Sequence, residues 1–183
     1  MNINGPSAIR VPDWVENPRG RYYLYFAHHH GRDIRIAVAD DLLGPWTVHG
    51  RGVLDIEATA AHAHVASPDV HVDHEQRRLR MYFHGGASGV STDQVTFVAS
   101  SKDGLDFAAS PARLAPFYLR VFEHDGWFYG VGKRGNRSGI LVRSEDPTAP
   151  FEAGATIIPR MRHAAVLKRD DDEAWVLYTR IGD

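Results

Sequence analysis

The sequence contains four copies of one short pattern, in which two strand-like segments are joined by a polar turn. The first segments of the four copies are residues 6–11, 67–73, 116–123 and 162–168. The second segments, which are rich in aromatic residues, are 21–27, 79–84, 126–133 and 173–180. Two alternating runs on either side of a polar turn predict a β-hairpin, and a pattern repeated along a chain predicts a repeat architecture.

Three of the four predicted hairpins continue into a third strand, an acidic turn and an aromatic residue. The third strands are residues 34–39, 95–100 and 140–144, and the aromatic residues are Trp46, Phe107 and Phe151. Each aromatic residue would begin a short fourth strand that packs on the others. The predicted unit is therefore a four-stranded antiparallel sheet, the blade of a β-propeller. A β-sandwich also has short strands and frequent turns, but the recurrent aromatic residue favours blades.

The predicted blades account for nearly all of the chain of 183 residues. Residues 5–54, 64–113 and 114–158 would form complete blades, and residues 160–183 would form part of another. We therefore expect residues 1–183 to be a single, incomplete propeller domain of about three and a half blades. A propeller ring closes with about 4–8 blades, so we expect the front part of a larger protein. Residues 51–66 form the longest segment predicted to be irregular.

Composition excludes several functional classes. The absence of cysteine excludes a disulfide framework, thiolate metal sites and a cysteine nucleophile. The formal net charge of −2 provides no basic surface of the kind that binds nucleic acid or membranes. The first residues lack the basic and apolar regions of a signal peptide. We therefore expect a cytoplasmic protein, or a periplasmic or secreted one if an upstream segment is missing.

Four short segments resemble those of a known group of enzymes. They are residues 4–7 (NGPS), 10–14 (RVPDW), 67–73 (SPDVHVD) and 162–166 (RHAAV). With the blade pattern, they make the chain resemble the five-bladed β-propeller glycoside hydrolases, the clan of families 43, 62 and 117, and especially its uncharacterised bacterial members. The resemblance implies an all-β propeller whose active-site groups lie where the innermost strand of each blade meets the central tunnel. It also implies hydrolysis of glycosidic bonds in a polysaccharide or oligosaccharide.

The resemblance identifies a candidate carboxylate in the second blade. Residues 67–70 (SPDV) resemble the family's Ala-Pro-Asp-Val, in which the Asp holds the sugar and tunes the acid. Asp69 is therefore the candidate orienting carboxylate, and the alternative is an Asp that caps a turn before a strand. Glycosidic cleavage needs one carboxylate to activate water or attack the sugar, and an acid to protonate the leaving oxygen.

The first and third blades depart from the family pattern. The family has Asp-Pro in the first strand, with this Asp as the base, whereas this chain has Gly5-Pro6. Asp13 is the nearest acidic substitute and is the candidate base, while the adjacent Trp14 suits stacking on a sugar ring. A loop Asp beside a structural Trp is the alternative. The family's acid, a Glu of the third blade, corresponds to Phe117 in this chain.

We expect His163, in the fourth blade, to supply the acid instead. Family 117 uses a His in this role, and the ordinary pKa of a His is about 6.5; a buried structural His is the alternative. In family 43 a His of this region lies at the propeller centre, in some members beside calcium, so a calcium ion near His163 is the one cofactor considered. The candidate substrate contacts are Arg10, Trp14, His64, His71, Tyr118 and Arg120.

The segment 62–74 is rich in His and Asp and also suggests a metal site. In a strand, Asp69, His71 and Asp73 would share one face, but their spacing is not specific for a metal, so we predict no metal ligands. We expect a glycosidase that acts on carbohydrate and has no nucleic-acid or membrane partner; its oligomeric state stays open. Because two carboxylate positions of the family are not filled, a non-catalytic propeller that binds carbohydrate or a partner is the second hypothesis. A lyase or transferase that acts on sugar is the third.

Overall fold

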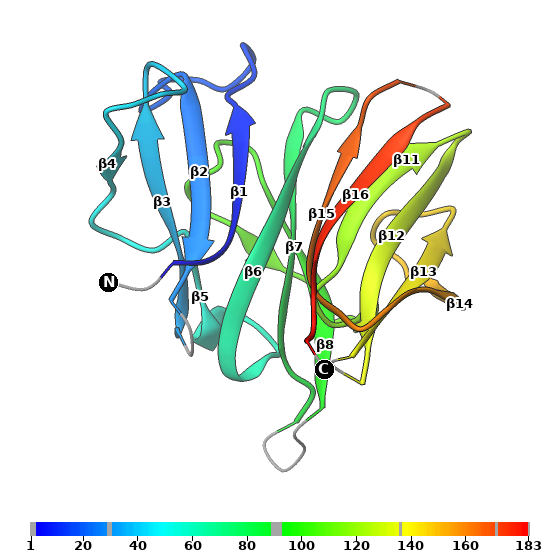
Figure 1. Cartoon of the computed structure of the whole chain (residues 1–183). Helices are drawn as coiled ribbons and strands as arrows, with labels where there is room; N and C mark the ends of the chain where they lie inside the picture. Colours follow the sequence, from blue (N-terminus) through cyan, green and yellow to red (C-terminus); the bar gives the residue numbers. More distant parts are fainter. Residues whose placement is uncertain (1–2, 29–30, 89–92, 136, 171, 183) are drawn as a thin grey trace.

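The computed structural model describes residues 3–28, 31–88, 93–135, 137–170 and 172–182. The chain forms four antiparallel β-sheets that lie side by side (Figure 1). Apart from one short 3-10 turn, η1 (Ile56–Ala58), the described secondary structure is all β. None of the described residues forms a helix that is long and apolar enough to cross a membrane.

Residues 4–116 form the first two sheets. The strand order in the first sheet is β1 (Asn4–Arg10), β2 (Tyr22–Ala27), β3 (Asp33–Ala39) and β4 (Thr47–Val48), and β5 (Leu54–Asp55) also pairs with β3. The order in the second sheet is β6 (His62–Asp73), β7 (Arg78–Gly86), β8 (Gln94–Ser101) and β10 (Ala115–Pro116), and β9 (Ala108–Ala109) also pairs with β8.

The remaining two sheets follow in sequence. The third has the order β11 (Arg120–His124), β12 (Trp127–Arg134), β13 (Ser138–Ser144) and β14 (Glu152–Pro159). The fourth consists of β15 (Met161–Lys168) and β16 (Ala174–Arg180). Each sheet therefore contains one of the four predicted hairpins, and the first three also contain the predicted third and fourth strands.

Two predictions of strand boundaries were wrong. Residues 51–66 are not irregular throughout, because β5, η1 and the start of β6 lie within them. Here β6 extends to His62 by pairing with Gly86, the last residue of β7. Residues 116–123 are not one strand either, since a φ of 59° at Tyr118 separates β10 from β11.

The first strands of the four sheets, β1, β6, β11 and β15, are neighbours. The Ser67 hydroxyl donates to Asn4 Oδ1 at 3.1 Å, and the Val70 N–H donates to Ser7 Oγ at 2.9 Å. Both contacts advance in the same direction along β1 and β6, so these two strands run parallel in space. Arg120 at the start of β11 reaches β6 and β15 with hydrogen bonds described below. We call these four the inner strands.

A two-residue bulge occurs at the start of the first three blades. Residues 5–6 in β1 and 67–68 in β6 lie where the pairing with β2 and β7 shifts register. Residues 118–119 have the same place before β11, because Phe117 O accepts a hydrogen bond from the Lys133 N–H at 3.0 Å and pairing resumes at Arg120. The first residues of the bulges, here called the bulge positions, have positive φ angles: 51° at Gly5, 50° at Ser67 and 59° at Tyr118.

The hydrophobic core lies between neighbouring blades. The largest cluster joins the first two sheets, and the fully buried Tyr25 also donates its hydroxyl to Gly104 O across them at 3.0 Å. A second cluster, around Ile140, joins the second and third sheets, and a smaller one around Met161 joins the third and fourth. Burial of aromatic and aliphatic side chains between blades therefore sets how the inner strands approach each other.

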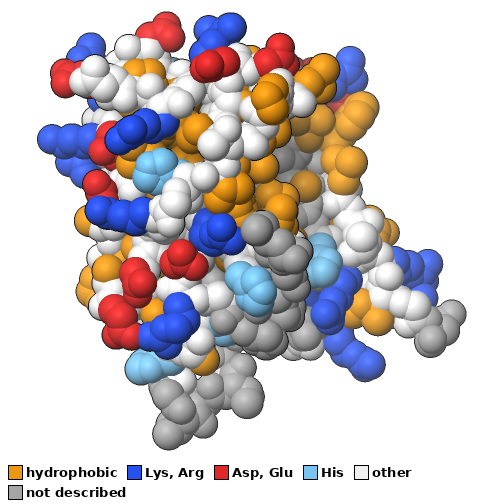
Figure 2. Space-filling model, turned by 90° about the vertical axis from the view of Figure 1, so that its left-hand side faces the viewer, with side chains coloured by type: hydrophobic (Ala, Val, Ile, Leu, Met, Phe, Trp, Pro, Cys, Tyr) orange, Lys and Arg blue, Asp and Glu red, His pale blue; other side chains and the backbone are white. Residues whose placement is uncertain are grey.

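The outer surface differs between the first and the last sheet. On the face beside the first sheet, acidic and basic side chains are intermixed (Figure 2). On the fourth sheet, several large apolar side chains are exposed: Leu167, Trp175, Leu177 and Tyr178.

Candidate functional site

A cavity of about 380 Å³ lies where the inner strands begin. Three blades contribute to it, and its lining residues are Ile3, Asn4, Gly5, Pro6, Tyr118, Arg162 and His163. Two of the predicted site residues, Tyr118 and His163, therefore meet in one cavity although 44 positions separate them in the chain. We call this the central cavity.

Tyr118 contacts both His163 and Arg120. Its ring centroid lies 5.3 Å from that of His163 and 4.8 Å from the guanidinium carbon of Arg120. The residue is buried and adopts the left-handed backbone conformation, which costs a non-glycine residue about 1–3 kcal/mol. The surrounding contacts, including a cation–π interaction, offset this cost and fix the ring beside His163.

Gly5 leaves no space for a side chain at the first bulge position. A Cβ atom on Gly5 would lie 2.6 Å from the Cα and Cβ atoms of Ser67. The resemblance places the catalytic base of the family immediately before Pro6, which is the position of Gly5. In this chain the side chain of Ser67 fills that space, so no carboxylate can occupy the position without moving β6 away from β1.

Asp69 is not among the residues that line the cavity, and it connects β6 to β11. Its Oδ2 atom accepts hydrogen bonds from the Val121 N–H at 2.8 Å and from His71 Nε2 at 2.9 Å, while Oδ1 lies 3.7 Å from Arg120 Nη1. Burial by itself raises the pKa of the Asp69 carboxyl. The interactions with His71, and then those with Arg120 and Val121, outweigh burial and hold this pKa below its ordinary value.

Arg120 joins three inner strands through its guanidinium. Nη1 donates to Pro68 O at 2.8 Å and approaches Ser67 O at 3.4 Å, both in β6. Nε donates to Ala164 O in β15 at 3.3 Å. The side chain is only 7% exposed, and its charge is balanced by Asp69. Arg120 is therefore a group that supports Tyr118 and does not line the central cavity itself.

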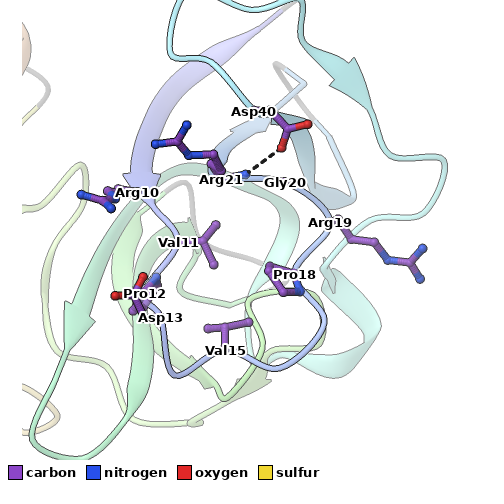
Figure 3. Close-up of a pocket in the computed structure, with 10 residues that line it drawn as sticks. All are labelled: Arg10, Val11, Pro12, Asp13, Val15, Pro18, Arg19, Gly20, Arg21 and Asp40. Atoms are coloured by element: carbon purple, nitrogen blue, oxygen red, sulfur yellow. Dashed lines mark hydrogen bonds between the residues drawn. The ribbon is translucent and has the colours of Figure 1, made fainter.

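Asp13, Trp14 and Arg10 lie at the opposite end of the first blade. Asp13 and Arg10 line a separate pocket of about 560 Å³ (Figure 3). The strand β1 runs from Asn4 at the central cavity to Arg10, and seven residues of strand span roughly 20 Å. Asp13 follows this far end, so the structure does not bring it together with His163. The candidate base Asp13 and the candidate acid His163 thus line different pockets.

Trp14 and the two candidate histidines also lie outside the central cavity. Trp14 packs against the core cluster of the first two sheets. His71 lines a cavity between the second and third blades and bonds to Asp69. His64 bonds to Gln94 Oε1 at 3.2 Å, and its ring lies 5.7 Å from that of His84. Of the six residues expected to contact sugar, only Tyr118 is among the described residues that line the central cavity.

Sequence reasoning missed two cationic residues of the site. Arg162 lines the central cavity directly beside His163, and its adjacency in the sequence was the available signal. Lys133 is buried in β12, with its ammonium 5.2 Å from the centroid of the Phe117 ring. Nothing in the strand pattern of β12 distinguishes Lys133 from a solvent-facing lysine. Within the described ranges, no three His, Asp or Glu side chains are grouped so that they could hold a metal ion.

The fold defines the class of protein to which the chain is similar. It matches a family 43 arabinoxylan arabinofuranohydrolase from Bacillus subtilis in complex with cellotetraose, with a TM-score of 0.72 and 20% identity over 94% of this chain and 42% of that one. An exo-β-1,3-galactanase from Clostridium thermocellum matches with a TM-score of 0.74 and 16% identity over 100% of this chain and 43% of that one. A family 117 glycoside hydrolase from Zobellia galactanivorans matches with a TM-score of 0.65 and 16% identity over 92% and 50%. The chain therefore has the fold of the five-bladed propeller glycoside hydrolases, which confirms the fold class predicted from the sequence.

The sequence itself is similar to that of a viral protein. The "uncharacterized protein R118" of Acanthamoeba polyphaga mimivirus is 33% identical over 217 residues, and the match includes 100% of this chain and 60% of the relative. The chain thus spans 60% of the length of this relative. No protein-family profile matches the sequence.

Proposed function

We propose that the central cavity binds a carbohydrate and that His163 is the acid in hydrolysis of a glycosidic bond. The observation that carries the proposal is the meeting of His163 and Tyr118 in a cavity at the start of the inner strands. An aromatic ring with a polar hydroxyl provides both an apolar surface for a sugar ring and a hydrogen-bonding group. Neighbours with the same fold bind carbohydrates such as cellotetraose and xylose, which supports this class of ligand.

His163 is the one imidazole among the described residues that line the cavity, and an imidazole is a side chain suited to donating a proton. In the proposed reaction its imidazolium donates a proton to the glycosidic oxygen as the bond to the anomeric carbon breaks. Water adds to that carbon and its released proton restores the imidazolium of His163, so hydrolysis yields two hydroxyl-terminated products. Asp69 is a positioning residue, because it acts through Arg120, whose guanidinium lies against Tyr118.

Carbohydrate binding without hydrolysis is the second candidate function. The observation that favours it is that no carboxylate is present among the described residues that line the central cavity. Glycoside hydrolysis ordinarily uses two carboxyl groups about 5–9.5 Å apart. The bulge position in β1 has no room for one of them, since a Cβ on Gly5 would meet Ser67 at 2.6 Å.

A screen of plant and algal oligosaccharides, with calorimetry for binding and product analysis for cleavage, tests both candidates. For a cleaved sugar, His163→Gln is expected to keep binding within about threefold and to lower kcat by about 10²–10⁴-fold. Tyr118→Ala is expected to weaken binding because the stacking surface is lost. Asp13→Asn, at the far end of β1, is the control and is expected to change neither quantity.

The outcomes separate the candidates. Binding without any product would support the second candidate and overturn His163 as an acid. Loss of cleavage in Asp13→Asn would move the site to the pocket at the opposite end of the blade. Absence of binding to every sugar would contradict both candidates.

A further inference from the structure

We infer that the central cavity accepts an anionic carbohydrate, one whose sugar carries carboxylate or sulfate oxygens close to Arg162. This inference rests on the proposal that the cavity binds carbohydrate and specifies the chemical class of that carbohydrate. It is carried by the arrangement of cationic side chains around the cavity and the scarcity of negative charge there.

Arg162 supplies a guanidinium at the wall of the cavity. The residue is exposed and lies next to His163 at the start of β15. No ion pair joins Arg162 to a carboxylate within the described part of the chain. A guanidinium presents two parallel N–H groups that match the oxygens of a carboxylate or sulfate. A neutral sugar would use this geometry only in part.

Lys133 adds a second cation from β12, behind the cavity wall. Only 3% of the residue is exposed, and its backbone N–H bonds to Phe117 O, the residue before Tyr118. Burial, and after it the positive charge of Arg162, lower the pKa of Lys133 to about 8. The two cations are therefore close enough to repel each other, and Lys133 is still mostly protonated at pH 7. An anion bound beside Arg162 relieves this repulsion, whereas a neutral sugar does not.

The Asp69 carboxylate already has hydrogen-bonding partners and a neighbouring cation. Asp69 accepts hydrogen bonds from His71 and Val121 and lies 3.7 Å from Arg120. Among the described residues that line the central cavity there is no carboxylate, whereas Arg162 contributes a guanidinium. The whole chain has a formal net charge of −2, so this excess of positive charge is local to the site. A local field of this sign favours anionic ligands over neutral ones.

Two matched pairs of oligosaccharides test the inference on the full chain. One pair is an oligogalacturonate and its methyl ester, and the other is a sulfated galactan oligosaccharide and its desulfated form. Calorimetry is expected to give about tenfold tighter binding for the charged member of at least one pair, the effect of one charge-assisted hydrogen bond. The pair that shows the difference identifies carboxylate or sulfate as the group recognised.

The variant Arg162→Gln is expected to abolish the preference, so that the charged and the neutral member of the pair bind equally well. Arg162 is exposed, so its replacement leaves the core between the blades intact. Arg19→Gln, in the pocket at the far end of the first blade, is the matched control and is expected to leave the preference unchanged.

The other outcomes of the binding experiments would contradict either the inference alone or the proposed function as well. Equal binding of charged and neutral members would overturn the inference and leave the proposed function standing. A preference that survives in Arg162→Gln, or that disappears in Arg19→Gln, would also overturn it. Absence of binding to all four sugars would count against the proposed function, and the inference would fall with it.

Discussion

At the scale of single residues, the backbone at the bulge positions decides which side chains can reach the central cavity. Tyr118 retains a large ring in the left-handed conformation, whereas Gly5 has no side chain because Ser67 fills the adjacent space. The sequence showed that the family's Asp is missing before Pro6. It did not show the reason, since the approach of β6 to Gly5 depends on contacts between residues more than 60 positions apart.

Gly5→Ala is predicted to destabilise the protein more than Gly126→Ala does. Both glycines have positive φ angles, 51° and 73°, so both substitutions carry a conformational cost of about 1–2 kcal/mol. Only at Gly5 does the new Cβ also meet backbone and side-chain atoms of Ser67, whereas nothing lies within 4 Å of a Cβ on Gly126. Thermal unfolding should therefore show a decrease in Tm of roughly 5–10 °C for Gly5→Ala and less for Gly126→Ala. Equal decreases would contradict the close packing of β1 against β6.

At the scale of the elements, alternation of apolar residues predicted the strands well and the irregularities poorly. The predicted segments 21–27 and 79–84 agree closely with β2 and β7, because both are rich in aromatic and aliphatic side chains that become buried. The break at Tyr118 and the extension of β6 to His62 were not foreseen. Both depend on pairing with a neighbouring strand, which local sequence does not encode.

Asp69→Asn is predicted to make the stability of the protein less dependent on pH in the acidic range. The pKa of Asp69 is lowered in the folded state, so its ionised form stabilises the fold at pH values above the ordinary carboxyl pKa of about 3.9. This contribution is lost as pH falls below about 4 and through the folded-state pKa. Urea unfolding at pH 7 and at pH 3 should therefore show a smaller difference in unfolding free energy for the variant than for the wild type. Asp13→Asn, which changes an exposed carboxylate in the other pocket, is the control. If the difference in unfolding free energy between pH 7 and pH 3 were the same in Asp69→Asn as in the wild type, the ion pair described between β6 and β11 would be contradicted.

At the scale of the whole molecule, the direction of the inner strands decides which residues meet. Asp13 is close in sequence to Gly5, but β1 places it at the opposite end of the blade. His163 is far away in sequence and reaches the central cavity because β15 begins there. Motif spacing identifies candidate residues, whereas their grouping depends on how the blades pack together.

Among the strands, amide hydrogen exchange is predicted to be slowest in β7 and fastest in β16. Almost all residues of β7 are buried between the first three blades, whereas nearly every residue of β16 is exposed. Local opening of β16 therefore disrupts few apolar contacts and has a low free energy. Mass spectrometry of peptides from the two strands checks this order. Comparable protection in both strands would mean that the fourth sheet is stabilised by contacts beyond those of the third core cluster.

The bulges also bear on how a lineage with this fold can change. The first three blades each have a bulge position in or just before the inner strand. A substitution at Tyr118, which lines the central cavity, would change the chemistry there, whereas one at Gly5 would also disturb the packing of β1 against β6. Identities of only 16–20% beside TM-scores of 0.72–0.74 show that this arrangement of strands is compatible with widely different sequences.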